Sequence, residues 1–497
     1  GSAVTISASG IDIGAGVITA TSYAGSGANL TGVGATIMVW EYNPDPYDTA
    51  VTLDTGIGIT FNQKIKAGSG NITLREDSSS GTVVENFGIG SSVTIAGNQL
   101  SMTPTSSLSE GQVYYLELPS GVITNMAGDN YVGTAYTFKA RVYDYTLWTW
   151  GINSNGNLGN NTDSDHVSSP VQVPGTTWAR AAQNAYGGIA TRTDGTLWTW
   201  GSNSYGNLGL NQAVATKISS PTQIPGTTWN LISSAYQAGY NAIKTDGTLW
   251  TWGWNYQGKL GQNNETKYSS PVQIPGTWSF IGNTYVGNAA INTDGELYSW
   301  GHNTYGELGH NDRTTRSSPV QVPGTTWSSF TIGRSIMFGI KTDGTLWSQG
   351  RGGEGALGQG ATADRSSPVQ IPGTTWKQVS SGQASMSVAA VKTDGTLWVW
   401  GNNDEGKLGL NNTTQYNSPV QVPGTTWDYV RFQRNAYAVK TDGTLWSWGT
   451  ANGQGQLGLN NETEYSSPVQ VGSETDWTGD KVMGSQENGT PIFIRKS

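Results

Sequence analysis

The chain has 497 residues, no cysteine and a formal net charge of −9, from 26 Lys and Arg against 35 Asp and Glu. The missing cysteines exclude a disulfide framework, a thiolate metal site and a cysteine nucleophile, and the acidic balance argues against a nucleic-acid partner. The chain has three scattered histidines, His166, His302 and His310, and no apolar run of about 18 residues. We therefore expect no metal, no cofactor and no membrane insertion.

Residues 1–42 are rich in Gly, Ala and Ser and alternate in short stretches such as Val4-Thr5-Ile6-Ser7. This pattern predicts a small N-terminal β-arm or tether. Because an extended arm can add to a neighbour's sheet edge, self-assembly or virion attachment through residues 1–42 is one hypothesis. An extra strand of the next domain, or a flexible leader, is the alternative.

Residues 43–141 alternate apolar and polar side chains in short runs such as Ile57–Phe61 and Tyr114–Leu118, which predicts an Ig-like β-sandwich. The segments Thr60–Gln63, Leu108–Leu116 and Asn125–Asp129 resemble a bacterial Ig-like domain of the S-layer-associated type. The resemblance implies a spacer module of a surface or secreted protein, and hence an extracellular, cell-surface or virion location.

A repeat of about 50 residues fills the rest of the chain. Its core reads Leu-Trp-x-Trp-Gly-x-Asn-x-x-Gly-x-Leu-Gly, followed by Ser-Ser-Pro-Val-Gln-Val-Pro-Gly-Thr-Thr-Trp and, after a variable stretch, Lys-Thr-Asp-Gly-Thr. Asp-Gly between apolar runs is a hairpin signal, so each unit predicts about four short strands. The glycine after the second aromatic position recurs at Gly151, Gly201, Gly253, Gly301, Gly350, Gly401 and Gly449.

The ends of this array predict a closed ring. The first unit begins in mid-motif at Tyr145, and the last unit stops in mid-motif at Ile494. The C-terminal strand can therefore complete the blade that residues 145–150 open, which leaves no free sheet edge. The prediction is an all-β chain, with residues 142–497 forming a seven-bladed β-propeller.

These motifs resemble the regulator of chromosome condensation repeat, a family of seven-bladed propellers. Family members that act as nucleotide exchange factors bind a small GTPase and chromatin. The Gly-Gly-x-His segment usual in the family before the Asp-Gly turn is absent here; Gly333-Arg334-Ser335-Ile336 stands in one such place, and no basic tail is present.

Most aromatic and acidic repeat residues have a structural interpretation. The periodic tryptophans are expected to fill the wedges between blades, among them Trp148, Trp198, Trp250, Trp398 and Trp446, with Gln349 as a polar replacement in blade five. The hairpin aspartates are expected to serve the turn, since Gly always follows: Asp194, Asp246, Asp294, Asp343, Asp394 and Asp442. We expect no catalytic residues among them.

Departures from the repeat are better binding candidates, because the fold does not require them. Tyr, Trp and Arg are the residue types that anchor interfaces, although each could equally be an ordinary rim residue. The candidates are Trp254, Tyr205, Tyr256, Tyr305, Tyr186, Tyr236, Tyr240, Tyr285, Arg334, Arg431 and Arg434.

The sequence thus predicts a non-enzymatic structural or adhesion protein of a cell surface or virus particle, with an Ig-like stalk and a propeller that binds a surface protein or glycan. Near-identical repeats joined to Ig-like modules resemble bacterial adhesins and bacteriophage attachment proteins. One alternative is a hydrolase or lyase with its site at the propeller mouth, which needs a convergent acid–base set. A third is a nucleotide-exchange-type scaffold.

Overall fold

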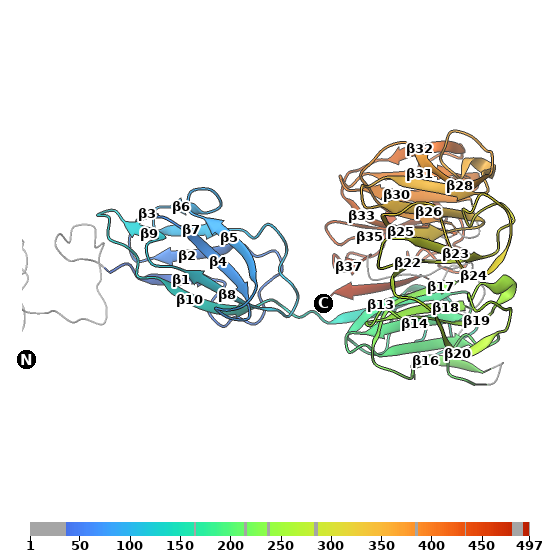
Figure 1. The fold of residues 1–497 in the computed structure, drawn as a ribbon, viewed down its shortest axis with the longest axis horizontal. Coiled ribbons are helices and arrows are strands. Elements are labelled where there is room, and N and C mark those ends of the chain that lie inside the picture. The colour runs from blue at the N-terminus through green and yellow to red at the C-terminus, as the bar shows by residue number, and fades with distance from the viewer. Residues whose placement is uncertain are drawn as a thin grey trace, which may run out of the picture. The chain divides into compact units, whose positions relative to one another are not determined.

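The computed structural model describes residues 36–163, 166–212, 216–235, 239–282, 287–382, 386–432, 434–479 and 491–496. The chain divides into two compact units, with the boundary between Val142 and Tyr143 (Figure 1). In the described residues the regular elements are strands and three single-turn 3-10 segments, so the predicted all-β class is confirmed. No helix in this part of the chain is long and apolar enough to cross a membrane.

The first unit contains two four-stranded sheets, in the orders β1-β2-β7-β6 and β10-β8-β4-β5, and the pair β3-β9. Alternation places one face of each strand in the core: in β2, Ile57, Ile59 and Phe61 are buried. The strands are β1 (Val39–Asn43), β2 (Ile57–Phe61), β3 (Ile65–Ala67), β4 (Asn71–Glu76), β5 (Val83–Gly88), β6 (Thr94–Ala96), β7 (Gln99–Met102), β8 (Val113–Leu118), β9 (Ile123–Asn125) and β10 (Thr134–Lys139).

Strand β1 begins before the predicted start of the sandwich at residue 43. It pairs with β2 through Tyr42 and Ile59, and Ile37 before it is buried in the same core. The end of the predicted arm is therefore part of the sandwich, because its apolar side chains complete the core. Residues 1–35 lie outside the described residues, so attachment through the arm stays a prediction.

The second unit contains seven four-stranded antiparallel sheets in the described residues, one per repeat. We call these sheets blades 1 to 7. Blade 1 combines β11 (Tyr145–Ile152) and β12 (His166–Val173) with β37 (Trp477–Thr478) and β38 (Ile492–Lys496). Since β11 pairs with β38 through Trp148 and Phe493, the two ends of the repeat array meet in one sheet, as the interrupted motifs predict.

Blades 2 to 7 each take four consecutive strands. Blades 2 to 4 are β13 (Trp178–Asn184), β14 (Gly187–Arg192), β15 (Leu197–Ser202), β16 (Lys217–Ile224); β17 (Trp229–Ala235), β18 (Gly239–Lys244), β19 (Leu249–Gly253), β20 (Tyr268–Ile274); and β21 (Trp278–Ile281), β22 (Gly287–Asn292), β23 (Leu297–Gly301), β24 (Arg316–Gln321). Blades 5 to 7 are β25 (Trp327–Ile332), β26 (Ile336–Lys341), β27 (Leu346–Gly350), β28 (Arg365–Ile371); β29 (Trp376–Ser381), β30 (Ser387–Lys392), β31 (Leu397–Gly401), β32 (Tyr416–Val422); and β33 (Trp427–Phe432), β34 (Ala436–Lys440), β35 (Leu445–Gly449), β36 (Tyr465–Gln470). The 3-10 segments are η2 (Tyr256–Gly258), η3 (Gly353–Gly355) and η4 (Asp404–Gly406).

The two tryptophans of each Leu-Trp-x-Trp-Gly motif have different environments. The second is fully buried, and in blades 2 and 3 its Nε1 donates to a backbone carbonyl in the preceding blade: Trp200 to Asn157 at 2.9 Å and Trp252 to Asn207 at 3.1 Å. The motif glycine Gly159 has a φ of +65°, and a Cβ there would meet the Trp200 ring at 2.8 Å. The repeat therefore joins each blade to its neighbour.

The first tryptophan of the motif is only partly buried, which corrects the expectation of full core positions. Each packs at the edge of a core cluster instead, and in blades 2, 3, 6 and 7 the exposed Thr-Asp-Gly turn lies beside it. The residues concerned are Trp148, Trp198, Trp250, Trp398 and Trp446. In blade 5, Gln349 fills the place of the fully buried tryptophan and its Nε2 donates to the Met337 sulfur at 2.9 Å.

Antiparallel order gives every blade two distinct ends. The Asp-Gly turn between the second and third strands shares one end with the Pro-Gly-Thr-Thr segment: the Trp229 amide donates to the Gly195 carbonyl at 3.0 Å. We call this the hairpin end. The first-to-second connection and the long Trp-Gly to Leu-Gly loop occupy the opposite end, which we call the loop end.

Candidate functional site

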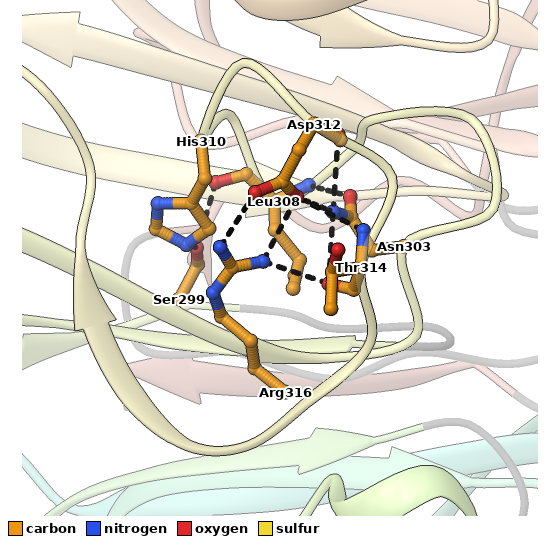
Figure 2. Close-up of polar contacts among 7 residues, drawn as sticks. All are labelled: Ser299, Asn303, Leu308, His310, Asp312, Thr314 and Arg316. Atoms are coloured by element: carbon orange, nitrogen blue, oxygen red, sulfur yellow. Dashed lines mark hydrogen bonds and ion pairs between the residues drawn. The ribbon is translucent and has the colours of Figure 1, made fainter.

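The motif asparagine fixes each loop at the loop end. Figure 2 shows the loop of blade 4, in which Asn303 Oδ1 accepts from the Leu308 amide at 2.9 Å. The Asn303 Nδ2 donates to the carbonyls of Asp312 at 3.2 Å and Thr314 at 3.1 Å. This side chain therefore replaces backbone partners that the loop lacks. The x positions of the motif are left for other roles.

The ionisable residues of this loop hold it together. Arg316 donates to both carboxylate oxygens of Asp312, at 2.7 and 3.0 Å, and this hydrogen bonding lowers the pKa of Asp312 (Figure 2). His310 Nε2 lies 3.0 Å from Ser299 Oγ, and burial lowers the pKa of His310. Within the described residues, no group of three His, Cys, Asp or Glu could hold a metal ion.

The hairpin aspartates serve their turns. Asp194 Oδ1 accepts from the Thr196 amide at 2.9 Å and from the Thr196 hydroxyl at 2.6 Å. These two hydrogen bonds stabilise the carboxylate and lower the pKa of Asp194. The same two bonds recur on Asp246, Asp343, Asp394 and Asp442.

Four of the candidate side chains form one continuous row at the loop end of blades 2 and 3. Tyr186 meets Tyr205 edge-on at 5.4 Å between ring centroids, Tyr205 stacks on Trp254 at 5.1 Å, and Trp254 stacks on Tyr256 at 5.4 Å. Tyr256 is 56% exposed, and the other three rings are partly exposed. We call Tyr186, Tyr205, Trp254 and Tyr256 the aromatic row.

Two lysines flank the aromatic row. The Lys267 Nζ lies 5.1 Å from the Tyr205 ring centroid and is exposed, whereas the Lys259 Nζ lies 4.9 Å from the Trp254 ring in a side chain that is 3% exposed. Burial lowers the pKa of Lys259 to about 7, because desolvation penalises the ammonium. The row therefore combines stacked ring faces with positive charge at its edge.

The remaining candidates are spread around the propeller. Tyr305 lies under the Arg351 guanidinium at 5.4 Å, and Arg334 and Arg434 are exposed. Tyr240 and Arg431 are a correction to the predicted rim: Tyr240 is 0% and Arg431 is 2% exposed, because both lie within strands that pack between blades. Tyr236 and Tyr285 lie outside the described residues.

Sequence reasoning missed Lys259, Lys267 and Arg351. A positional rule would have found Arg351. The residue before the middle glycine of Trp-Gly-x-Asn-x-x-Gly-x-Leu-Gly contacts the residue after the first glycine of the same motif in the next blade. Tyr205 meets Trp254 in this way, and Tyr305 meets Arg351. The signal is present in the spacing of the motif, but it becomes visible only once the blades are placed side by side.

Comparison with known families agrees with this geometry. Residues 35–146 match the bacterial Ig-like domain family. The regulator of chromosome condensation (RCC1) repeat matches seven segments that together cover more than half of the chain: 146–188, 194–236, 246–281, 294–338, 343–388, 394–430 and 442–479. The chain belongs to the RCC1 repeat family. No curated protein matches the sequence significantly.

Solved RCC1 propellers share this fold at low sequence identity. Human WBSCR16 has a TM-score of 0.63 at 17% identity, over 71% of this chain and 100% of its own. Yeast RCC1 (Prp20), solved with Kap60 bound, has a TM-score of 0.61 at 17% identity, over 72% of this chain and 90% of its own. Prp20p of Saccharomyces cerevisiae, described with its binding to Gsp1p and histones, has a TM-score of 0.61 at 17% identity, over 71% of this chain and 92% of its own. RCC1 propellers thus include scaffolds that bind proteins.

Proposed function

We propose that the chain is a non-enzymatic structural or adhesion protein of a cell surface or virus particle, whose propeller binds a partner surface through the aromatic row. The observation that carries the proposal is the uninterrupted contact of Tyr186, Tyr205, Trp254 and Tyr256 across two blades. These residues occupy positions that the repeat leaves variable, so folding does not explain their size.

The chemistry of the aromatic row favours a glycan over a protein partner. Tyr and Trp offer an apolar ring face and a polar edge. A sugar ring matches this, because its C–H groups can stack on the ring face while its hydroxyl groups reach the polar edge. Lys267 adds a cation beside Tyr205, which would favour an acidic or hydroxyl-rich ligand. A protein partner, as described for the yeast relatives, is the other outcome of the test, and an exchange-type scaffold would fall under it.

The surface location is supported by the N-terminal unit. Residues 35–146 match a bacterial Ig-like domain, and such domains serve as spacers in surface proteins. Self-assembly through residues 1–42 remains part of the proposal.

A glycan array probed with the labelled full chain tests the proposal. We expect defined glycans to bind. Trp254→Ala should weaken their binding by about tenfold or more, since central aromatic anchors dominate binding energy. The matched control is Trp40→Ala, which removes another tryptophan, 70% exposed, on the Ig-like unit. Absence of glycan binding, or equal loss in both variants, would contradict a glycan-binding row.

A hydrolase is the second candidate, and one observation in blade 4 favours it. The Thr304 hydroxyl lies 2.6 Å from His302 Nε2, and His302 Nδ1 lies 2.6 Å from Glu307 Oε1. Glu307 is 1% exposed and also accepts from the Tyr305 amide at 2.8 Å. A hydroxyl, an imidazole and a buried carboxylate in this order can activate a nucleophile.

Ester hydrolysis distinguishes the two candidates. If the chain is non-enzymatic, p-nitrophenyl acetate is cleaved equally by the wild type, by Thr304→Val and by His302→Gln. If the three residues act together, each substitution removes most of a measurable activity, and the wild type shows a burst of product from the acylated hydroxyl.

A further inference from the structure

Six blades hold a cation of their own between two indole rings at the hairpin end. In blade 3, the Lys244 Nζ lies 4.7 Å from the Trp229 ring and 4.6 Å from the Trp250 ring. In all six, the distance from cation to ring centroid is 4.0 to 5.2 Å. The cations are Arg192, Lys244, Lys341, Lys392, Lys440 and, in blade 1, Arg495.

Blade 4 keeps the ring pair and lacks the cation. Asn292 is paired opposite Trp278 in strands β21 and β22, where Lys244 is paired opposite Trp229 in blade 3. Tyr298 takes the place of the first motif tryptophan and meets Trp278 edge-on at 5.4 Å. Among the described residues, no Lys or Arg lies over either ring. Trp278 and Tyr298 thus form a cation cage without a resident cation, which we call the blade-4 cage.

The hairpin beside the blade-4 cage carries an extra carboxylate. Glu296 stands where five other hairpins have threonine, and its Oε2 accepts from Asn292 Nδ2 at 2.8 Å and from the Tyr298 hydroxyl at 3.1 Å. Asn292 Oδ1 in turn accepts from the Glu296 amide at 2.9 Å, so this side chain folds back onto the turn. With Asp294 and Glu296 and no lysine, the hairpin has a formal charge of −2, whereas an Asp and a Lys cancel in blade 3.

A groove gives access to the blade-4 cage. It has a volume of about 620 Å³, and Trp278, Tyr298 and Asn292 line it together with residues of blade 3. Equivalent grooves of about 530 and 450 Å³ exist at two other blade boundaries, but Lys440 and Arg495 line those.

One further departure from the repeat lies beside this cage. The connection before Trp278 reads Pro-Gly-Thr-Trp, one threonine shorter than the Pro-Gly-Thr-Thr-Trp before Trp229. The Trp278 Nε1 is buried without a hydrogen-bond partner in the described residues, but so are the Trp376 and Trp477 Nε1 in cages that hold a cation, so this feature does not distinguish blade 4. Four changes from the repeat therefore concentrate around one ring pair: Asn292, Glu296, Tyr298 and the shortened connection.

We propose that the blade-4 cage binds the ammonium group of a lysine side chain presented by a partner protein. The chain itself shows that two aromatic rings at this position hold primary ammonium and guanidinium groups, because its six other cages contain them. In blades 2, 3, 5, 6 and 7 the two ring centroids lie 6.1 to 6.5 Å apart, whereas Trp278 and the smaller Tyr298 ring lie 5.4 Å apart. Glu296 and Asp294 supply the charge that the incoming cation would neutralise. The cage lies at the hairpin end and the aromatic row at the loop end, so this proposal does not depend on the proposed function.

The test is an NMR titration of the full chain with 15N-labelled tryptophan, in which the Trp278 indole signal is assigned by its loss in Trp278→Phe. The probes are the blocked tripeptide acetyl-Gly-Lys-Gly-amide, choline, and neohexyl alcohol, the uncharged isostere of choline. We expect the lysine peptide to shift the Trp278 signal and the alcohol to leave it unchanged. An equal shift with the alcohol, no shift with the peptide, or a response to choline alone would overturn a lysine-binding cage.

Asn292→Lys is the decisive variant, because it restores the residue of the repeat and fills the cage from within. We expect this variant to fold and to bind the lysine peptide about tenfold more weakly, or weaker still. The reciprocal double variant Lys440→Asn with Thr444→Glu empties the blade-7 cage and should create a second site. If Asn292→Lys binds as the wild type does, or if the double variant melts normally and gains no site, the proposal is wrong.

Discussion

At the hairpin end of the propeller, blade after blade places the same indole pair and turn, whereas at the loop end neighbouring blades place different side chains on the same backbone. The residue after Trp-Gly shows this variation: Ile152, Ser202, Trp254, His302, Arg351, Asn402 and Thr450. The comparison teaches that repeated side chains serve folding and that departures are available for binding. Blade 4 sharpens it, since its hairpin end departs from the repeat at several positions together.

The largest effect should come from a repeated residue in the wedge between blades. Trp400 is 0% exposed, and its Nε1 donates to the Ala356 carbonyl at 2.9 Å. Trp400→Ala should lower the free energy of unfolding by about 3–5 kcal/mol, as large-to-small core substitutions do. Urea denaturation measures the loss, and the variable residue Tyr256 provides the control. If Tyr256→Ala lowers the free energy of unfolding as much as Trp400→Ala does, the distinction between repeated and variable residues is wrong.

The second prediction concerns the pH dependence of stability and Lys259. Its folded pKa is about 7 and its ordinary value 10.5, so between these pH values the folded state has lost the proton that the unfolded state still binds. The free energy of unfolding should therefore rise by a few kcal/mol in total between pH 7 and 10.5. Lys259→Asn should abolish this rise in chemical denaturation measured at several pH values.

The matched control for Lys259 is Lys407→Asn in blade 6. Lys407 has the same motif position, directly before Leu-Gly, but its side chain is partly exposed. This variant should keep the wild-type slope of stability against pH. A slope that survives Lys259→Asn would mean that another group titrates.

The third prediction separates fixed and variable positions within one loop. Asn303→Ala removes the acceptor of the Leu308 amide and the donor to two carbonyls, and should cost about 1–3 kcal/mol because buried backbone groups lose their partners. Tyr305→Ser, two residues away, should change stability by about 0.5 kcal/mol or less. Thermal melting of the two variants side by side measures the difference, and equal losses would show that the whole loop is structural.

The smallest effect should be a gain. Asn292→Lys supplies the missing cation between Trp278 and Tyr298, which should stabilise the fold by about 0.5–1 kcal/mol. The opposite substitution in a regular blade, Lys392→Asn, should destabilise by a similar amount, since Lys392 lies 4.6 Å from both the Trp376 and Trp398 rings. A loss of stability in both variants would mean that the blade-4 rings are not arranged as a cation cage.

The sequence predicted the architecture because the repeat encodes it redundantly. Motif spacing and Asp-Gly turns predict strands in every unit, and the interrupted ends predict the pairing of β11 with β38. Alternation alone could not place the start of the sandwich, since the first strand lies at the edge of its sheet and its side chains do not alternate between buried and exposed. Residues Val39–Asn43 show this limit.

The candidate site was predicted only in part. Departures from the repeat identified Tyr186, Tyr205, Trp254 and Tyr256, but not that the four are in contact, because the contacts cross from one blade to the next. Tyr240 was wrongly predicted to lie on the rim, because a strand position that faces a neighbouring blade cannot be told from an exposed one in the sequence. The absence of a lysine from the blade-4 cage could be recognised only by comparison with the six blades in which a cation lies between the two rings.

The most direct test of the account is the affinity of an array-selected glycan for two variants of the full chain, Tyr205→Ala at the loop end and Lys392→Ala at the hairpin end. We predict that Tyr205→Ala weakens binding by about tenfold or more at an unchanged melting temperature. Lys392→Ala should lower the melting temperature and leave the affinity as it is. The reverse pattern would contradict the division between repeated residues that fold the propeller and irregular residues that bind.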